Sequence, residues 1–416
     1  MLSTARSRLA IVHQPTFKLA LTVMLWQASS GVFLLSLVQQ YLPEQLGANA
    51  GFPGYALAFY ASGRFLLQAP AGWLADWFGR RRTLILGVAV TLVSVVLMFQ
   101  VQDATLFLTF SALYGAGSAA IWPSIMATVG DNHPPSERGR VLNMLNLSQL
   151  LGLGIGTMVG ITLTDLISYQ AAFAACLGFS SLALACAYRG SGTASVGAAA
   201  QTAPRPAGGL RRALLSPQVL LLAAIALLLS IGTTVQAPVV GDYSSEVLQT
   251  KLHVLGLMLL PPAAVAGFIA VRFGHLADRF GRQVPLIGGL AVAAGCYYAL
   301  SLTTHPLVAV HLVVLAGLGY AISIPAWGAA ALDATEIGGR GLMLGILATV
   351  QSLGGAVGQA LGGVTNAAWG PVAPFKLGAI LLVLALVLTV LHLHQQRRHQ
   401  QRGSAATGSA DLKAAA

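Results

Sequence analysis

The sequence predicts an all-α polytopic membrane protein in which twelve transmembrane helices form two parallel repeats of six. Three observations support this prediction. Charged residues are scarce, long apolar runs recur along the chain, and the second half repeats the pattern of the first half. Together they place most of the chain in lipid rather than in water.

The composition lies far outside that of a soluble domain. Only 8% of the 416 residues are charged and 56% are hydrophobic, whereas soluble domains carry about 25% charged residues. A helix needs about 20 apolar residues to cross the hydrocarbon layer. Runs such as LILGVAVTLVSVVLMF at 84–99 and LLAAIALLLSIGTTV at 221–235 suit that environment.

Charges, prolines and glycine clusters divide the chain into candidate spans. The first span follows Arg6, Arg8 and Lys18, and its apolar stretch is longer than a signal-peptide core, so we expect it to be retained. The predicted spans lie near 17–41, 52–75, 83–101, 105–129, 140–162, 170–188, 217–241, 252–273, 284–303, 306–331, 341–365 and 374–393.

These spans form two predicted six-helix bundles, at 1–188 and 217–393. The segment that joins them, 189–216, is rich in Gly, Ala, Pro and Ser, a composition typical of a flexible linker. The polar tail at 394–416 is expected to be disordered.

The loop charges predict the orientation of the chain, because cytoplasmic loops carry an excess of Lys and Arg. The side opposite the termini receives only Lys251 and Lys376, while Arg64 and Arg272 fall within spans. Both termini and the linker are therefore predicted to be cytoplasmic. Their side receives nineteen basic residues: Arg6, Arg8, Lys18, Arg80, Arg81, Arg82, Arg138, Arg140, Arg189, Arg205, Arg211, Arg212, Arg279, Arg282, Arg340, Arg397, Arg398, Arg402 and Lys413.

An internal repeat appears when the chain is shifted by about 202 residues, with no gap over some ninety residues. Arg138 then meets Arg340, and Gln149 meets Gln351. The stretch GWLADWFGRRR at 72–82 returns as GHLADRFGRQ at 274–283. The matched positions in this stretch are Gly72, Asp76, Gly79 and Arg80 with Gly274, Asp278, Gly281 and Arg282.

These features resemble the major facilitator superfamily over essentially the whole chain. The family signature, Gly-x-x-x-Asp-x-x-Gly-Arg-Arg/Lys-Arg/Lys between spans two and three, is matched at 72–82, and the second copy departs from it at Gln283 and Val284. The resemblance implies two bundles that expose a central cavity alternately to each side of the membrane. The resemblance gives almost no information about the identity of the substrate.

In this family the motif aspartate acts at the cytoplasmic gate. The resemblance implies that Asp76 lies near Arg340, at the positive N-terminal end of helix eleven. Asp278 is expected to face the start of helix five, near Arg138. The arginines of the motif, including Arg80, also set the topology. We expect these charge–dipole pairs to break when the cytoplasmic side opens.

Other functional classes are disfavoured. The net charge of +11 is explained by the topology, so no nucleic-acid partner is expected. No zinc-type cysteine spacing and no Gly-Lys-Ser/Thr phosphate loop is present, so no metal, cofactor or intrinsic ATPase is predicted. LGLGIG at 151–156 resembles a dinucleotide loop, but no strand precedes it. Gly152, Gly156 and Gly160, repeated in helix eleven, instead predict close helix packing.

Arg64 is the main candidate for substrate binding. It lies twelve residues before Asp76, about 18 Å along a helix, which is near the midplane of a layer about 30 Å thick. Tyr60 and Gln68 share its helix face. A midplane arginine requires an anion or cavity water. A carboxylate or phosphate of the substrate would serve, and the alternative is pairing with backbone carbonyls or with Gln359.

Further polar residues near the midplane are candidates for lining a cavity, although interhelical hydrogen bonding explains them equally well. They are Gln27, Asn146, Gln149, Tyr320 and Gln351. His311 and Asp242 are the candidates for proton coupling. Neither has a partner that the sequence identifies, and a structural histidine is the default interpretation for His311.

The leading hypothesis is a secondary transporter of the inner membrane that moves a small organic, anionic solute by alternating access, acting as a monomer. The alternative is a proton-coupled drug or sugar efflux pump. Drug antiporters of the superfamily usually carry an arginine at the position of Ser111 and a Gly-Pro pair in helix five, and this chain has neither. Clustered catalytic residues are also lacking, so an enzyme is not expected.

Overall fold

The computed structural model describes residues 15–190, 217–259, 261–262, 283–333 and 340–391. These ranges are almost entirely helical and contain no strand. Seven of their helices are long and apolar enough to cross a membrane, which confirms the all-α polytopic class. The count of twelve spans stays a prediction, because part of the eighth span lies outside the described residues.

The chain forms two compact units. Unit 1 comprises Met1–Arg205, Thr234–Met258 and Gly355–Pro374, and unit 2 comprises Pro206–Thr233, Leu259–Gly354 and Phe375–Ala416. Two segments from the second half of the sequence therefore belong to unit 1. The predicted linker at 189–216 and tail at 394–416 lie almost wholly outside the described residues.

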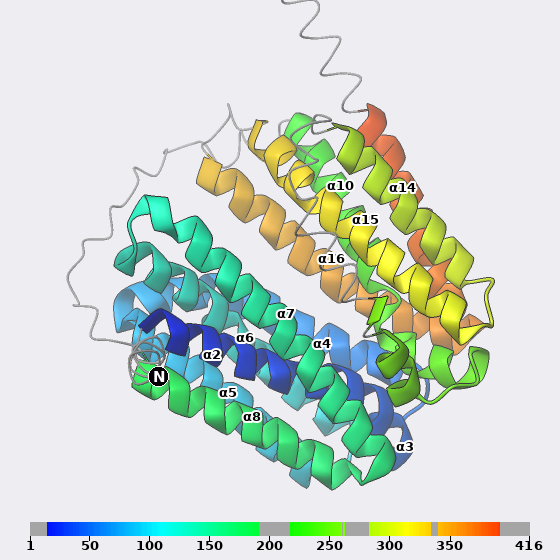
Figure 1. Ribbon diagram of the computed structural model, residues 1–416, viewed down its shortest axis with the longest axis horizontal. Helices are drawn as coiled ribbons and strands as arrows, with labels where there is room; N and C mark the ends of the chain where they lie inside the picture. The colour runs from blue at the N-terminus through cyan, green and yellow to red at the C-terminus, as the bar shows by residue number, and fades with distance from the viewer. Residues whose placement is uncertain (1–14, 191–216, 260, 263–282, 334–339, 392–416) are drawn as a thin grey trace, which may run out of the picture. The chain divides into compact units, whose positions relative to one another are not determined.

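Unit 1 contains a bundle of long helices, which Figure 1 colours from blue to green. Helices α2 and α7 pack along one another, as do α4 and α6, and α5 and α6. The elements of this bundle are α2 (Pro15–Gly31), the π-helix η1 (Val32–Tyr41), α3 (Leu42–Leu46), α4 (Phe52–Phe78), α5 (Arg80–Gln100), α6 (Ala104–Asn132), α7 (Pro135–Leu166) and α8 (Tyr169–Gly190).

The ends of these helices follow from local sequence chemistry. Gly79 separates α4 from α5 with φ of 90°, a conformation that L-residues rarely adopt. At the start of α6 the side chain of Asp103 accepts a hydrogen bond of 2.6 Å from the backbone N–H of Thr105, which satisfies one of the free donors at a helix N-terminus. Gly79, which belongs to the 72–82 motif, therefore also ends α4.

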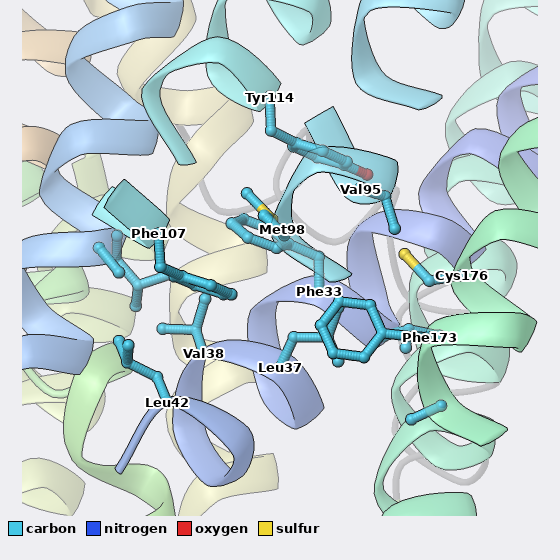
Figure 2. Packing of buried hydrophobic residues seen from close by; sticks show 14 of the residues in the cluster. Phe33, Leu37, Val38, Leu42, Val95, Met98, Phe107, Tyr114, Phe173 and Cys176 are labelled. Carbon is cyan, nitrogen blue, oxygen red and sulfur yellow. The ribbon is translucent and has the colours of Figure 1, made fainter. Parts of the chain in front are cut away.

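The core of unit 1 is built from aromatic and branched side chains (Figure 2). Phe33 and Leu37 of η1 pack with Phe107 and Tyr114 of α6 and with Phe173 of α8. All five side chains are buried. Because close-packed side chains allow little sliding of one helix along another, this core fixes the register of η1, α6 and α8.

Glycines allow α2 and α7 to approach closely. A Cβ on Gly152 would overlap the carbonyl oxygen of Met24, and one on Gly156 would overlap that of Ala28. A Cβ on Gly160 would lie 2.9 Å from the Cα of Val32. This confirms the predicted packing role of the glycine series in place of a nucleotide loop.

Gly156→Ala is expected to lower the melting temperature of the purified chain in detergent, since overpacking a tight contact costs about 1–3 kcal/mol. Gly154 is the matched control, because nothing lies within 4 Å of the position of its Cβ. There, alanine should leave the melting temperature unchanged or raise it, since it gains up to about 1 kcal/mol of helix propensity. Equal melting temperatures for the two variants would contradict a close α2–α7 interface.

Segments from the second half of the sequence complete unit 1 at one end of its helices. They are the 3₁₀ turn η2 (Ala237–Val239), the short helices α11 (Val240–Asp242) and η3 (Tyr243–Val247), the helical residues 252–258, and the last part of α16 (Arg340–Trp369). The Nε2 of Gln39 donates to the carbonyl of Ala237 at 2.9 Å. A Cβ on Gly54 of α4 would lie 2.5 Å from the Cα of Gly363.

Unit 2 is a second group of apolar helices. It contains most of α10 (Pro217–Thr234), α14 (Gln283–Leu300), α15 (Pro306–Asp333), the first part of α16, and the helical residues from Phe375 to Leu391. Its core joins Leu222 and Leu229 of α10 with Leu290 of α14 and Leu382. A Cβ on Gly289 would overlap the carbonyl oxygen of Gly319, so α14 and α15 are also in close backbone contact.

Candidate functional site

Helices α4 and α6 hold two of the predicted substrate residues at a fixed height. A Cβ on Gly115 would overlap the carbonyl oxygen of Tyr60, and a Cβ on Gly63 would overlap that of Ala112. The two backbones are therefore locked in register over this stretch. Arg64 lies about one helical turn beyond Tyr60, next to the contact.

Aromatic packing positions the Tyr60 ring. Its centroid lies 5.8 Å from that of Phe33 and 6.0 Å from that of Tyr114, while Phe33 and Tyr114 stack at 4.5 Å. The hydroxyl of Tyr114 is 3.1 Å from the Oγ of Ser30 and 3.3 Å from that of Ser29. Tyr60 therefore rests on a packed aromatic and hydroxyl cluster.

Arg64 carries a charge that the described part of the chain does not neutralise. Its side chain is half-buried, and it has no hydrogen-bond or ion-pair partner among the described residues. Neither alternative partner is found there. Gln359 forms no hydrogen bond with it, and the Oε1 of Gln359 is itself buried without a hydrogen-bond partner. A half-buried guanidinium without a counter-ion is unfavourable.

The other predicted residues of unit 1 are not brought together into one cluster. Gln27 of α2 is buried and Gln149 of α7 is half-buried, and neither has a partner in the described ranges. Helices α2 and α7 run parallel, because Met24 contacts Gly152 and Ala28 contacts Gly156, so Gln27 lies level with Ile155 along the helix axis. Gln149 precedes Ile155 by six residues and therefore lies about 9 Å from Gln27 along that axis. Asn146 is exposed.

Tyr320 and Gln351 line the same cavity within unit 2, which has a volume of about 230 Å³. The hydroxyl of Ser230 donates to the carbonyl of Gln351 at 2.6 Å, and that of Ser323 donates to the carbonyl of Gly319 at 2.9 Å. The cavity residues, none of them charged, are Leu229, Ser230, Leu286, Leu290, Tyr320, Ser323 and Gln351.

The motif residue Arg80 is used inside unit 1. Its guanidinium contacts the carboxylate of Asp131 and the carbonyl of Ala127, both near the end of α6. A cation is favourable at a helix C-terminus, where the dipole is negative. Arg81 donates to the carbonyl of Tyr188 at 2.6 Å. These contacts tie the 72–82 loop to α6 and α8.

Most of the predicted gate lies beyond what the structure describes. Gly274, Asp278, Gly281 and Arg282 fall outside the described residues. Nothing is described of the side chains of Asp76, Arg138 and Arg340. Gly72 lies within α4 with open space where a Cβ would be, and Gly79 terminates that helix.

The two proton-coupling candidates differ in their surroundings. Asp242 of α11 is half-buried, and its Oδ2 accepts a hydrogen bond of 2.6 Å from the Nδ2 of Asn366, a partner that the sequence does not reveal. Asn366 also donates to the carbonyl of Ala50 at 3.2 Å. His311 of α15 is exposed, and its Nδ1 lies 2.7 Å from the carbonyl of Leu307 on the same helix.

One charged cluster was missed by the sequence analysis. Asp165, at the end of α7, accepts from Gln40 of η1 at 2.7 Å and lies 2.6 Å from the Nδ1 of His253. The pair is separated by 88 residues, and neither residue belongs to a motif. The only available signal was an acidic residue at the end of a predicted span.

Comparisons with known proteins agree with this architecture. The family model described as Major Facilitator Superfamily matches residues 19–310 and 222–414. The uncharacterized MFS-type transporter YwfA of Bacillus subtilis (strain 168) is 23% identical over 393 residues, which cover 92% of this chain and 93% of the relative. Multidrug resistance protein 3 of the same organism is 29% identical over 102 residues, or 24% of this chain and 20% of that protein.

A solved structure shares the fold. The crystal structure of peptide transporter POT in complex with sulfate aligns with a TM-score of 0.73 over 92% of this chain and 94% of that chain, at 14% identity.

Proposed function

The chain belongs to the major facilitator superfamily and is a membrane transporter, and on this premise we propose that it moves a small organic anion by alternating access, as a secondary transporter. The observation that carries the proposal is Arg64. Its half-buried guanidinium has no partner in the described ranges. A carboxylate or phosphate group on the solute supplies the missing counter-charge, and Arg is suited to bind it bidentately.

The cavity in unit 2 supports an organic solute rather than a bare inorganic ion. Leucines form its walls, while Ser230, Ser323, Tyr320 and Gln351 offer hydrogen-bonding groups. Such a mixture of apolar surface and a few polar groups is typical of a small-molecule site. We assign this cavity, like Tyr60, Gln27, Asn146 and Gln149, to solute contact.

Drug or sugar efflux coupled to protons is the second candidate, favoured by the partial match to Multidrug resistance protein 3. Two features count against drug efflux. Ser111 stands where such antiporters usually carry an arginine, and its hydroxyl is buried and donates to the carbonyl of Phe107 at 2.9 Å. The described acids of unit 1 also lie at helix ends rather than beside Arg64.

We further propose that Asp242 is the coupling carboxylate. It is half-buried within the apolar helical stretch Val219–Val247, and it accepts a hydrogen bond from the neutral amide of Asn366. His311 is less suited, because it is exposed and its Nδ1 is engaged by its own helix. Protons are then the coupling ion.

The gate and topology follow the same scheme. Asp76 and Asp278 act as latches to the starts of helices eleven and five, near Arg340 and Arg138. The pairing of Arg80 with Asp131 keeps the first motif rigid within unit 1. Both termini are cytoplasmic, the chain lies in the inner membrane, and the monomer is the working unit. The loop charges support this orientation.

A thermal-shift screen of the purified chain against a metabolite library tests the proposed function. Carboxylated or phosphorylated compounds are expected to raise the melting temperature, because a ligand that binds the folded state at 100 times its Kd stabilises it by about 2.7 kcal/mol. The hits are then tested as radiolabelled solutes in proteoliposomes. A set of hits that is entirely neutral or cationic would refute an anionic solute.

A further inference from the structure

Asp165 joins the first and second halves of the sequence within unit 1. The carboxylate lies at the C-terminal end of α7, next to the last turn of η1 and the start of the helical residues 252–258. We call Gln40, Asp165 and His253 the Asp165 latch. It is distinct from the Arg64 region, from the unit 2 cavity and from Asp242.

Both oxygens of the Asp165 carboxylate have hydrogen-bond partners in the latch. Its Oδ1 accepts from the Nε2 of Gln40 at 2.7 Å. Its Oδ2 lies 2.6 Å from the Nδ1 of His253 and 3.3 Å from the backbone nitrogen of the same residue. The side chains of His253 and Asp165 are only 13% and 14% exposed. When His253 is protonated, a charge pair this sheltered is screened far less by salt than a surface pair.

The surrounding charged and titratable groups do not replace the histidine. Tyr169 of α8 donates to the Oε2 of Glu44 on α3 at 2.5 Å. Lys251 precedes the helix and is exposed, without a partner among the described residues. His253 is therefore the cationic group that can neutralise Asp165 at this position.

Protonation of His253 controls the strength of the contact. With a proton on both ring nitrogens, an imidazolium faces a carboxylate and the pair is charge-assisted. When that proton leaves, the neutral ring can still donate from Nδ1 but loses the ionic attraction. Histidine is the side chain whose charge ordinarily changes between about pH 5 and 8. The other two donors to Asp165, the backbone N–H of His253 and the amide of Gln40, do not change their charge with pH.

We propose that the Asp165 latch is a proton-binding site that closes one face of the transporter, the external face in the proposed topology. This inference rests on the proposed function, in which that face must open and close. Protonated His253 favours the closed latch, so opening releases a proton and closing binds one. By linkage, a higher proton concentration at this face shifts the chain toward the closed state.

Distance measurements between spin labels test the latch without any solute. Ile167, beyond α7, and Leu257 are exposed on the two sides of the latch and accept labels in the full chain. The native cysteines Cys176, Cys186 and Cys296 are replaced by alanine, and the melting temperature of the cysteine-free chain is compared with that of the unchanged chain. Pulsed electron paramagnetic resonance in nanodiscs then reports the open fraction from about pH 5 to about pH 8.

The open-to-closed ratio is expected to rise at least about fivefold over this range. In His253→Gln most of this pH dependence should be lost, and the remainder is assigned to Asp242. In His253→Lys, which keeps a cation that does not titrate there, the latch should stay closed throughout. His305→Gln is the matched control, since His305 is exposed and lies outside unit 1, and it should behave as the unchanged chain.

A full pH response in His253→Gln, or an open latch in His253→Lys at high pH, would overturn the proposal. The lysine variant provides the test even where the glutamine variant folds poorly. The outcomes are separate from those of the solute screen. If His253→Gln loses the pH response but the unchanged chain transports no anion, only the proposed function is refuted. If the unchanged chain transports an anion but His253→Gln keeps the full pH response, only the latch is refuted.

Discussion

Arg64→Gln is expected to weaken binding of the anionic solute by at least about a hundredfold, or about 2.8 kcal/mol. Glutamine keeps most of the side-chain length and removes the charge, so packing near Gly115 and Tyr60 is little disturbed. The solute anion then loses its charge-assisted partner in a half-buried environment, where removing one partner of a charge pair costs about 2–5 kcal/mol. The dissociation constant is measured by isothermal titration with the strongest hit of the screen.

The same substitution separates a binding role from a structural one. Without solute, the variant should melt at the same temperature as the unchanged chain or higher, because an uncompensated charge is removed from a half-buried position. A structural arginine would show the opposite. Arg64→Lys should lose about tenfold in affinity, since lysine keeps the charge but not the bidentate geometry.

Arg82→Gln is the control for a general effect of positive charge. Arg82 is exposed and its guanidinium lies over the ring of Phe78, 5.7 Å from the centroid. Its loss should leave the dissociation constant unchanged. Equal affinity of Arg64→Gln and the unchanged chain for the anion would refute the role of Arg64.

The fold could be predicted because its signals are local and repeated. Apolar run length and the scarcity of charge define spans without any knowledge of helix contacts. The glycine series on α7 was assigned to packing from its spacing alone, and the contacts of Gly152 with Met24 and of Gly156 with Ala28 confirm it. Small residues four apart define one helix face, whichever helix it meets.

The site could be predicted only in part, because its partners are set by helix register. The position of Arg64 follows from counting residues along one helix, but its lack of a partner depends on which side chains α6 and the neighbouring helices present. The contacts Arg80–Asp131 and Asp165–His253 join residues that no motif links. Asn366 likewise meets Asp242 only because the end of α16 returns to unit 1.

Asp242→Asn is expected to abolish proton-driven accumulation while sparing solute exchange. One proton coupled to one monovalent anion is an electroneutral step, so a gradient of one pH unit supports about tenfold accumulation, equivalent to about 1.4 kcal/mol. Asparagine cannot take up the proton, and the accumulation ratio should fall to about one. Exchange of internal for external solute needs no net proton movement and should continue.

The surroundings of the Asp242 carboxylate suit a group that binds and releases a proton. Asp242 is half-buried in an apolar stretch, and the amide of Asn366 that holds it at 2.6 Å is neutral. A neutral donor orients the carboxylate without fixing a charge beside it, so the group can be protonated in one state of the cycle and ionised in another. The asparagine side chain keeps a carbonyl oxygen to accept the same hydrogen bond, which limits the structural change.

Proteoliposomes with an imposed pH gradient and radiolabelled solute measure both quantities in one preparation. His311→Gln is the matched control, because it removes an exposed titratable group from α15 and should accumulate solute like the unchanged chain. The pH response of the Asp165 latch should persist in Asp242→Asn, since the two carboxylates have different partners. Full accumulation by Asp242→Asn would exclude this residue, and loss of both accumulation and exchange would make it a structural group.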